Sequence, residues 1–209
     1  MKKLCFLLMA LLLLAGCAGK PAAPPAETPA TETPETPEAA AAAAPPSAAP
    51  AEAPAVEGLG GAFMAASLSS LGAEEVSLGE LIGGNRLTLI NVWATFCGPC
   101  IREMPDLGDL AREYADRGFG IVGLTCDVLD GKGRVQQSVV VDALSIVADT
   151  GVDYPVLIMS LELIEETGIQ YIPTSYFVDE NGNILDGPLV GSMSRTDWTA
   201  LIESCLPDE

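Results

Sequence analysis

Residues 87–100 of the chain read LTLINVWATFCGPC. Its first seven residues are mostly apolar or β-branched, which is typical of a strand buried on both faces of a sheet. This run leads directly to Cys97 and Cys100, which are separated by Gly98 and Pro99. When such a pair stands where a strand meets a helix, the first cysteine lies at the helix N-terminus. Unpaired backbone N–H groups and the positive end of the helix dipole favour a thiolate there.

The second cysteine lies one helical turn further on, so the two thiols can close a disulfide across that turn. Pro99 fits this position because its missing N–H would have no partner inside the helix. A thiolate at Cys97 can attack a substrate disulfide, and Cys100 can then resolve the mixed disulfide. Two alternatives are half of a zinc site and an inert structural disulfide. The zinc alternative lacks further ligands, because the chain has no histidine and no second Cys-x-x-Cys pair.

The rest of the chain after Cys100 alternates between helical and strand patterns. These patterns predict a helix over 101–117 closed by Gly118, a strand over 119–124, a helix over 135–150, strands over 174–178 and 184–190, and a last helix from Ser194 to about Leu206. Residues 179–183 carry a hairpin signal between the two late strands. Val139, Leu144 and Val147 are among the apolar positions of the second helix. The order predicts an α/β fold in which helices flank a central mixed sheet.

One stretch of this pattern resembles a known family. Trp93-Ala-Thr-Phe-Cys-Gly-Pro-Cys100, followed by Glu103-Met-Pro105, resembles the TlpA/ResA family of extracytoplasmic thiol-disulfide oxidoreductases. The resemblance covers about residues 60–206. It implies a thioredoxin-like fold with an N-terminal β extension over 62–82 and a central insertion around 127–160.

The resemblance also implies roles for residues around the cysteine pair, with Trp93, Gly98 and Pro99 as its surroundings. It implies a cis bond between Ile172 and Pro173 beside the disulfide, where the backbone pairs with an extended substrate peptide. The alternative is a proline that simply begins a strand.

Asn91 and Glu103 are candidates for a role in proton transfer at the cysteine pair. Counting back from Cys97, Asn91 stands where thioredoxins have a buried aspartate, and Glu103 matches a glutamate common in the family. A partly buried Glu103 near Cys100 can have a raised pKa and accept the thiol proton. The alternative is a first-turn carboxylate that only complements the helix dipole.

Cys126 and Cys205 allow several interpretations. Cys126 follows the second strand, at the sheet edge that carries the cysteine pair, so a relay role is one hypothesis. A second disulfide between Cys126 and Cys205 is another. The simplest is that both are small buried apolar side chains.

The first 57 residues have a different composition. Residues 1–17 read MKKLCFLLMALLLLAGC, a positive start and an apolar run that indicate a secretory signal peptide. Its end resembles a bacterial lipobox, which implies cleavage before Cys17 and acylation of that residue. The alternative is an ordinary signal with a chance cysteine. Residues 18–57 are almost wholly Ala, Pro, Glu and Thr, which predicts a disordered linker. We place the thioredoxin-like domain at residues 58–209.

The amino-acid composition excludes several classes of function. The formal net charge is −19, which argues against a nucleic-acid partner. The absence of histidine excludes Ser-His-Asp and Cys-His nucleophilic sites and histidine-ligated metals. Together with this composition, the lipobox and family resemblances imply a monomeric, membrane-anchored, extracytoplasmic thiol-disulfide oxidoreductase with no cofactor or metal beyond its Cys97–Cys100 disulfide.

By the resemblance, the partners of this enzyme are exported proteins with disulfides, for example those awaiting haem attachment in cytochrome c maturation, and a membrane thiol relay that donates electrons. The Gly98-Pro99 pair, as in thioredoxins, favours reduction of substrates. The alternatives are a disulfide-forming oxidase, a peroxide reductase and a redox-inactive binding module on a stalk.

Overall fold

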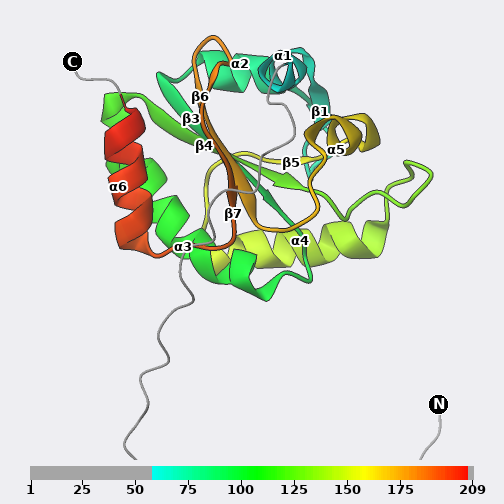
Figure 1. The fold of residues 1–209 in the computed structure, drawn as a ribbon. Helices are drawn as coiled ribbons and strands as arrows, with labels where there is room; N and C mark the ends of the chain where they lie inside the picture. The colour runs from blue at the N-terminus through cyan, green and yellow to red at the C-terminus, as the bar shows by residue number, and fades with distance from the viewer. Residues whose placement is uncertain (1–57, 207–209) are drawn as a thin grey trace, which may run out of the picture. The chain divides into compact units, whose positions relative to one another are not determined.

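The computed structural model describes residues 58–206, which form a sheet between two layers of helices (Figure 1). The helices are α1 (Leu59–Ala65), α2 (Leu78–Gly83), α3 (Gly98–Glu113), α4 (Gln137–Thr150), α5 (Leu161–Thr167) and α6 (Arg195–Cys205), with a 3-10 turn over Ala115–Arg117. The strands are β1 (Ser67–Ser69), β2 (Glu75–Ser77), β3 (Leu87–Trp93), β4 (Phe119–Thr125), β5 (Val156–Ile158), β6 (Thr174–Asp179) and β7 (Ile184–Val190).

The main sheet has the strand order β5-β4-β3-β6-β7. The central strand β3 is parallel to β4 and antiparallel to β6, while β5 extends the parallel side and β7 the antiparallel side. A separate antiparallel hairpin of β1 and β2 precedes this sheet. The mixed sheet and the N-terminal β extension are therefore as the sequence predicts.

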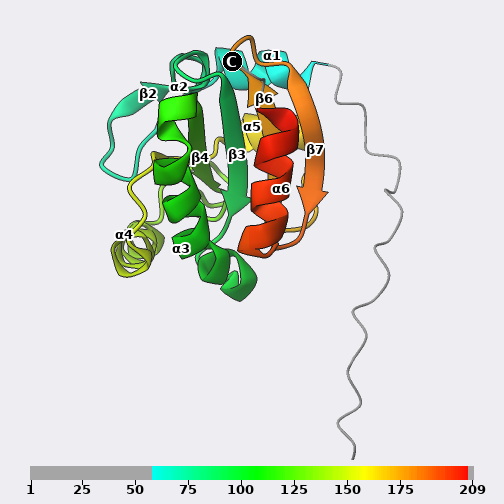
Figure 2. The same cartoon turned by 90° about the vertical axis from the view of Figure 1, so that its left-hand side faces the viewer.

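Successive side chains of β3 point alternately into two apolar cores, one on each face of the sheet. Leu87, Leu89 and Trp93 face α3 and α6 in one core, and Ile90 and Val92 face the layer of α1, α2 and α5 in the other. All seven residues of β3 are buried, as expected for a strand covered on both faces. Figure 2 looks onto the layer formed by α3 and α6. Asn91 lies two residues from both Leu89 and Trp93. Because side chains alternate along a strand, Asn91 faces α3 as they do.

Most predicted elements are present, with shifted ends. The helix predicted over 101–117 begins at Gly98 and ends at Glu113, and Gly118 then closes the following 3-10 turn with a φ of 83°. A residue with a side chain is strained at that φ, so glycine is suited to the position. Ser194 caps α6, because its side chain accepts a hydrogen bond from the backbone N–H of Asp197.

The sequence patterns missed four short elements, namely α1, α2, β5 and α5. The predicted insertion over 127–160 contains α4 and β5, and α4 is the helix predicted over 135–150. The order of elements from β3 onward is therefore the predicted one with β5 and α5 added between α4 and β6. Of the apolar positions named for α4, Leu144 is 47% exposed, and the buried residues of this helix are Val140 and Ala143.

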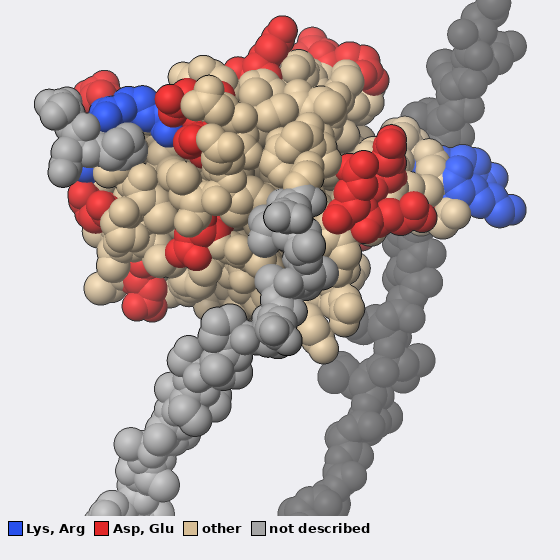
Figure 3. Space-filling view, turned by 45° about the horizontal axis from the view of Figure 1, so that its top comes forward, with Lys and Arg blue, Asp and Glu red and all other residues tan. Residues whose placement is uncertain are grey.

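The predictions for the signal peptide, for Cys17 and for the linker over 18–57 lie outside the described residues. None of the helices within 58–206 combines the length and the apolar character needed to cross a bilayer. Figure 3 shows carboxylate side chains spread over one face of the molecule, with Lys and Arg gathered in a few small spots.

Candidate active site

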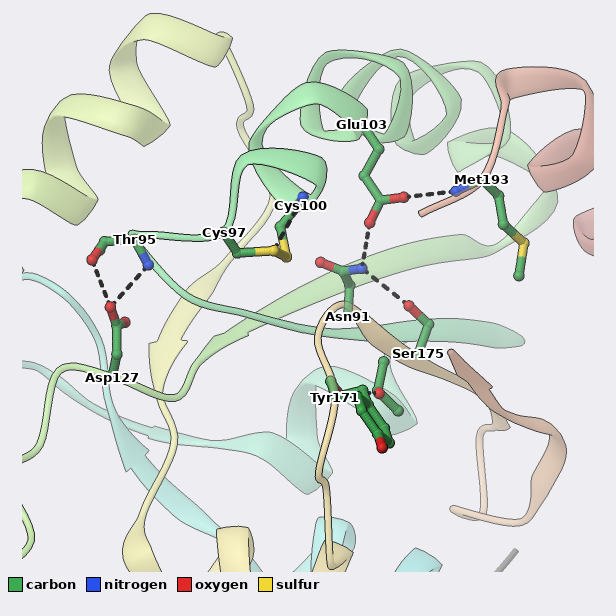
Figure 4. Close-up of a disulfide and its surroundings, with 10 residues drawn as sticks. Asn91, Thr95, Cys97, Cys100, Glu103, Asp127, Tyr171, Ser175 and Met193 are labelled. Carbon is green, nitrogen blue, oxygen red and sulfur yellow. Dashed lines mark hydrogen bonds between the residues drawn. A yellow bond between two sulfur atoms is a disulfide. The ribbon is translucent and has the colours of Figure 1, made fainter. Parts of the chain in front are cut away.

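The two cysteines of the Cys-x-x-Cys pair form a disulfide at the start of α3 (Figure 4). Cys97 is the N-cap residue, and its sulfur accepts a hydrogen bond of 3.3 Å from the backbone N–H of Cys100. Cys97 is 5% exposed and Cys100 is fully buried, while the neighbouring Phe96 is 77% exposed. Cys97 is therefore the more accessible cysteine of the pair, and the exposed ring of Phe96 belongs to the residue just before it.

Glu103 lies on α3 three residues after Cys100, on the same side of the helix. Its side chain is 3% exposed. The carboxylate accepts hydrogen bonds from the side-chain amide of Asn91 (3.3 Å) and from the backbone N–H of Met193 (3.1 Å). Burial raises the pKa of Glu103 to about 7, and these donors, together with the nearby Trp198, keep the pKa from rising further. Glu103 can therefore exchange a proton near neutral pH.

Asn91 joins Glu103 to the neighbouring strand. Its amide nitrogen donates a second hydrogen bond, of 3.0 Å, to the hydroxyl of Ser175. Asn91 and Ser175 are direct partners in the antiparallel pairing of β3 with β6, which explains why the two side chains meet. Figure 4 shows the amide of Asn91 between the disulfide and Ser175, below the carboxylate of Glu103. The amide is thus held by two partners and can keep Glu103 in place.

The loop that leads to Cys97 is held from β4. Thr95 donates hydrogen bonds from its backbone N–H (2.9 Å) and its hydroxyl (2.5 Å) to the carboxylate of Asp127. Asp127 also accepts a hydrogen bond from the hydroxyl of Thr125, at the end of β4. Sequence reasoning missed Asp127. The available signal was its position just after a strand that runs parallel to β3, since parallel strands end at the same sheet edge.

The peptide bond between Ile172 and Pro173 is cis. Pro173 comes just before β6, whose first residue, Thr174, pairs with Val92 near the end of β3. Pro173 therefore lies at the sheet edge that carries the cysteine pair. Tyr171, two residues earlier, is 68% exposed.

Cys126 and Cys205 are free thiols in the structure. Cys126 lies at the sheet edge of the active site, and its backbone N–H donates to the carbonyl of Trp93. Burial, with a smaller contribution from Asp127, raises the pKa of the Cys126 thiol to about 11. Very little of it is thiolate at neutral pH, which argues against the relay hypothesis. Among residues 58–206, no cluster of His, Cys, Asp or Glu side chains could hold a metal ion.

Several known proteins are similar to this chain. The family model described as Redoxin matches residues 48–197. The chain belongs to the Redoxin family. It is 24% identical over 141 residues to the thiol-disulfide oxidoreductase ResA of Bacillus thuringiensis (strain Al Hakam), covering 67% of this chain and 74% of the relative. It is 31% identical over 131 residues to the thioredoxin-like protein YneN of Bacillus subtilis (strain 168), covering 63% and 71%.

Among solved structures, a thiol:disulfide interchange protein of the thioredoxin family from Chlorobium tepidum TLS superposes with a TM-score of 0.56. It is 28% identical and covers 68% of this chain and 93% of its own. These likenesses confirm the predicted thioredoxin-like fold and the resemblance drawn from the sequence. This Redoxin-family protein is a thiol-disulfide oxidoreductase.

Proposed function

We propose that the protein is a membrane-anchored, extracytoplasmic reductase of disulfides in exported proteins. The observation that carries the proposal is the Cys97–Cys100 disulfide at the start of α3, in which Cys97 is 5% exposed, Cys100 is fully buried and Glu103 lies on the same helix face. The Gly98-Pro99 pair, shared with thioredoxins, supports the direction of electron flow. Exported proteins that await haem attachment are one class of substrate that fits.

The reaction starts from the reduced dithiol. The thiolate of Cys97 attacks one sulfur of the substrate disulfide, which forms a mixed disulfide and releases the other substrate sulfur as a thiolate. Cys100 then loses its proton and attacks the sulfur of Cys97. This second step forms the Cys97–Cys100 disulfide and releases the second substrate thiolate, so two electrons pass to the substrate.

Glu103 is the acceptor of the proton that Cys100 loses in the second step. A carboxylate with a pKa of about 7 is partly ionised at neutral pH and can take up this proton. The Cys97 thiolate needs no such base, because it lies at the N-terminus of α3 and accepts from the backbone N–H of Cys100.

A trapping experiment tests the two roles of the cysteines. The reduced Cys100→Ser variant, mixed with insulin as an oxidised protein substrate, should accumulate a covalent mixed disulfide on non-reducing gels. The matched Cys97→Ser variant should not, although it keeps the thiols of Cys126 and Cys205. A similar adduct in both variants would contradict the assignment of Cys97 as the nucleophile.

The rate of the second step tests Glu103. In wild type the rate of insulin reduction should rise with pH through a midpoint near 7. Glu103→Gln should lower the rate by at least roughly tenfold and remove that midpoint, without unfolding the protein. Equal rates in the two proteins at every pH would leave Glu103 as a structural residue only.

The remaining parts of the proposal are the anchor and the partners. A lipid on Cys17 holds the protein at the outer side of the cell membrane, and a membrane thiol relay reduces the Cys97–Cys100 disulfide after each turnover. The protein works as a monomer, without a cofactor, metal or nucleic acid. The lipobox resemblance supports the anchor, and the Cys17→Ser variant should move from the membrane fraction to the soluble fraction. Retention in the membrane would contradict it.

A further inference from the structure

Arg102 is an exposed arginine of α3 that forms no ion pair with any carboxylate of the described residues. Other arginines of the described chain do form such pairs, namely Arg112, Arg117, Arg134 and Arg195. The whole chain has 29 Asp and Glu residues against 10 Lys and Arg residues. Carboxylates are therefore plentiful, and the place of this unpaired guanidinium has to be understood from what else lies beside it.

The guanidinium of Arg102 lies beside the first turn of α3, next to the cysteine pair. Its Nη1 atom is 3.3 Å from the position that a Cβ atom would take at Gly98. Arg102 follows Gly98 by four residues, and residues four apart are neighbours on the surface of a helix. Helical side chains also lean toward the N-terminus, so the side chain of Arg102 reaches back along α3. Gly98 has no side chain and leaves room for it.

This arrangement brings a positive charge close to Cys97. A Cβ atom lies about 1.5 Å from its Cα atom, and consecutive Cα atoms are about 3.8 Å apart across a trans peptide bond. The Nη1 atom of Arg102 is therefore within about 9 Å of the Cα atom of Cys97. The sulfur of Cys97 also lies at this end of α3, because it accepts a hydrogen bond from the backbone N–H of Cys100.

We propose that the charge of Arg102 stabilises the thiolate of Cys97 in the reduced protein. The positive end of the α3 dipole acts on the same sulfur, and Arg102 adds a full charge to it. A larger fraction of Cys97 is then reactive thiolate at neutral pH. The consequence for turnover rests on the proposed role of Cys97 as nucleophile, whereas the effect on its ionisation does not.

The other ionisable groups around the cysteine pair do not supply this charge. Glu103 on α3 and Asp127 after β4 are carboxyl groups, and a negative charge disfavours a nearby thiolate. The thiol of Cys126 has a pKa of about 11 and is uncharged at neutral pH. The segments 169–173 and 191–194, which lead into β6 and α6, contain no Asp, Glu, Lys or Arg.

The distance sets the size of the effect. Two unit charges about 9 Å apart in bulk water change an ionisation constant by roughly twofold, and a dielectric constant half that of water increases this to roughly fivefold. Cys97 is 5% exposed, and the guanidinium of Arg102 is exposed to solvent, so an intermediate value applies. We expect Arg102 to increase the ionisation constant of Cys97 by roughly threefold.

The test measures the rate at which iodoacetamide alkylates Cys97 in the fully reduced protein, as a function of pH, with the modified residue located by mass spectrometry. The midpoint of this profile reports the ionisation of Cys97, because only the thiolate reacts. Arg102→Gln should lower the ionisation constant by roughly threefold. Arg102→Lys keeps the charge and should stay near wild type.

The matched control is Arg112→Gln, which removes the same charge from the same helix about 15 Å further along its axis. It should leave the midpoint of Cys97 unchanged. An unchanged midpoint in Arg102→Gln would overturn the proposal, as would equal shifts in Arg102→Gln and Arg112→Gln. A shift in Arg102→Lys as large as that in Arg102→Gln would also overturn it.

Salt separates an effect of charge from a structural one. The screening length is about 30 Å in 0.01 M salt and about 3 Å in 1 M salt. The difference between wild type and Arg102→Gln should therefore be present in the dilute buffer and nearly vanish in the concentrated one, and a difference that ignores salt would contradict the proposal. If these results hold while the trapping experiment gives the same adduct in both cysteine variants, the proposed function fails and the inference about Arg102 stands.

Discussion

Replacing Glu103 by glutamine should make the stability of the protein depend less on pH. In the folded, oxidised protein the pKa of Glu103 is raised from 4.5 to about 7. Well below pH 4.5 the carboxyl is protonated in both the folded and the unfolded chain, so it contributes no pH dependence of stability there. As the pH rises to 7 and beyond, the unfolded chain loses the proton more easily. The contribution of Glu103 to the free energy of unfolding should therefore fall by about 3 kcal/mol over this range, since each pKa unit corresponds to about 1.4 kcal/mol.

Glutamine does not ionise, so this contribution vanishes in the Glu103→Gln variant. The assay is urea unfolding of both proteins, with the disulfide intact, at several pH values between about 4 and 8.5. The variant should gain about 3 kcal/mol relative to wild type from the acid end to the alkaline end. A constant offset between the two proteins is compatible with the reasoning, because the amide of the variant and the carboxylate of wild type meet the surrounding donors differently. A stability difference that does not change with pH would refute it. Glu165→Gln, at an exposed position on α5, is the matched control.

Three further predictions concern the surroundings of the site. Asp127→Ala leaves the N–H and hydroxyl of Thr95 without their acceptor, and should cost about 1–3 kcal/mol in urea unfolding; a smaller loss would mean that water replaces the carboxylate. The thiol of Cys126 has a pKa of about 11, so it should resist alkylation by iodoacetamide at mildly alkaline pH in the folded protein. Mass spectrometry follows the reaction, and rapid alkylation would contradict the burial of this thiol. Ser194→Ala should cost about 1 kcal/mol of stability through loss of the α6 cap, whereas Ser194→Asp should keep most of it, and equal losses would contradict capping.

The sequence predicts the parts of the molecule that rest on local patterns. The run over 87–93 predicts a strand buried on both faces, and β3 is buried throughout. The capping residue Ser194 marks the start of α6. Short elements carry too little pattern, which is why the three residues of β5 were missed. Helical periodicity does not predict that Leu144 is exposed, because α4 has apolar residues on both of its faces. Packing against the rest of the fold determines which face is buried.

The chemistry of the site was only partly predictable. The cysteine pair could be found from its spacing, and Glu103 could be found from the family resemblance, which has a glutamate three residues after the second cysteine. The hydrogen bonds that hold the Glu103 carboxylate could not be predicted. Asn91 reaches it through the alternation of β3, while Met193 comes from the far end of the chain. The contact between Thr95 and Asp127 likewise depends on the register between β3 and β4.

The central claim is that the Cys97–Cys100 pair passes electrons to substrates. The most direct test is the reduction potential of this pair, measured by equilibrating the protein with glutathione or dithiothreitol buffers. The account predicts a value near that of thioredoxin, roughly −270 mV, which suits a reductase supplied by a membrane donor. A value near roughly −120 mV would mark an oxidant that installs disulfides, and would contradict both the proposed direction and the link to haem attachment.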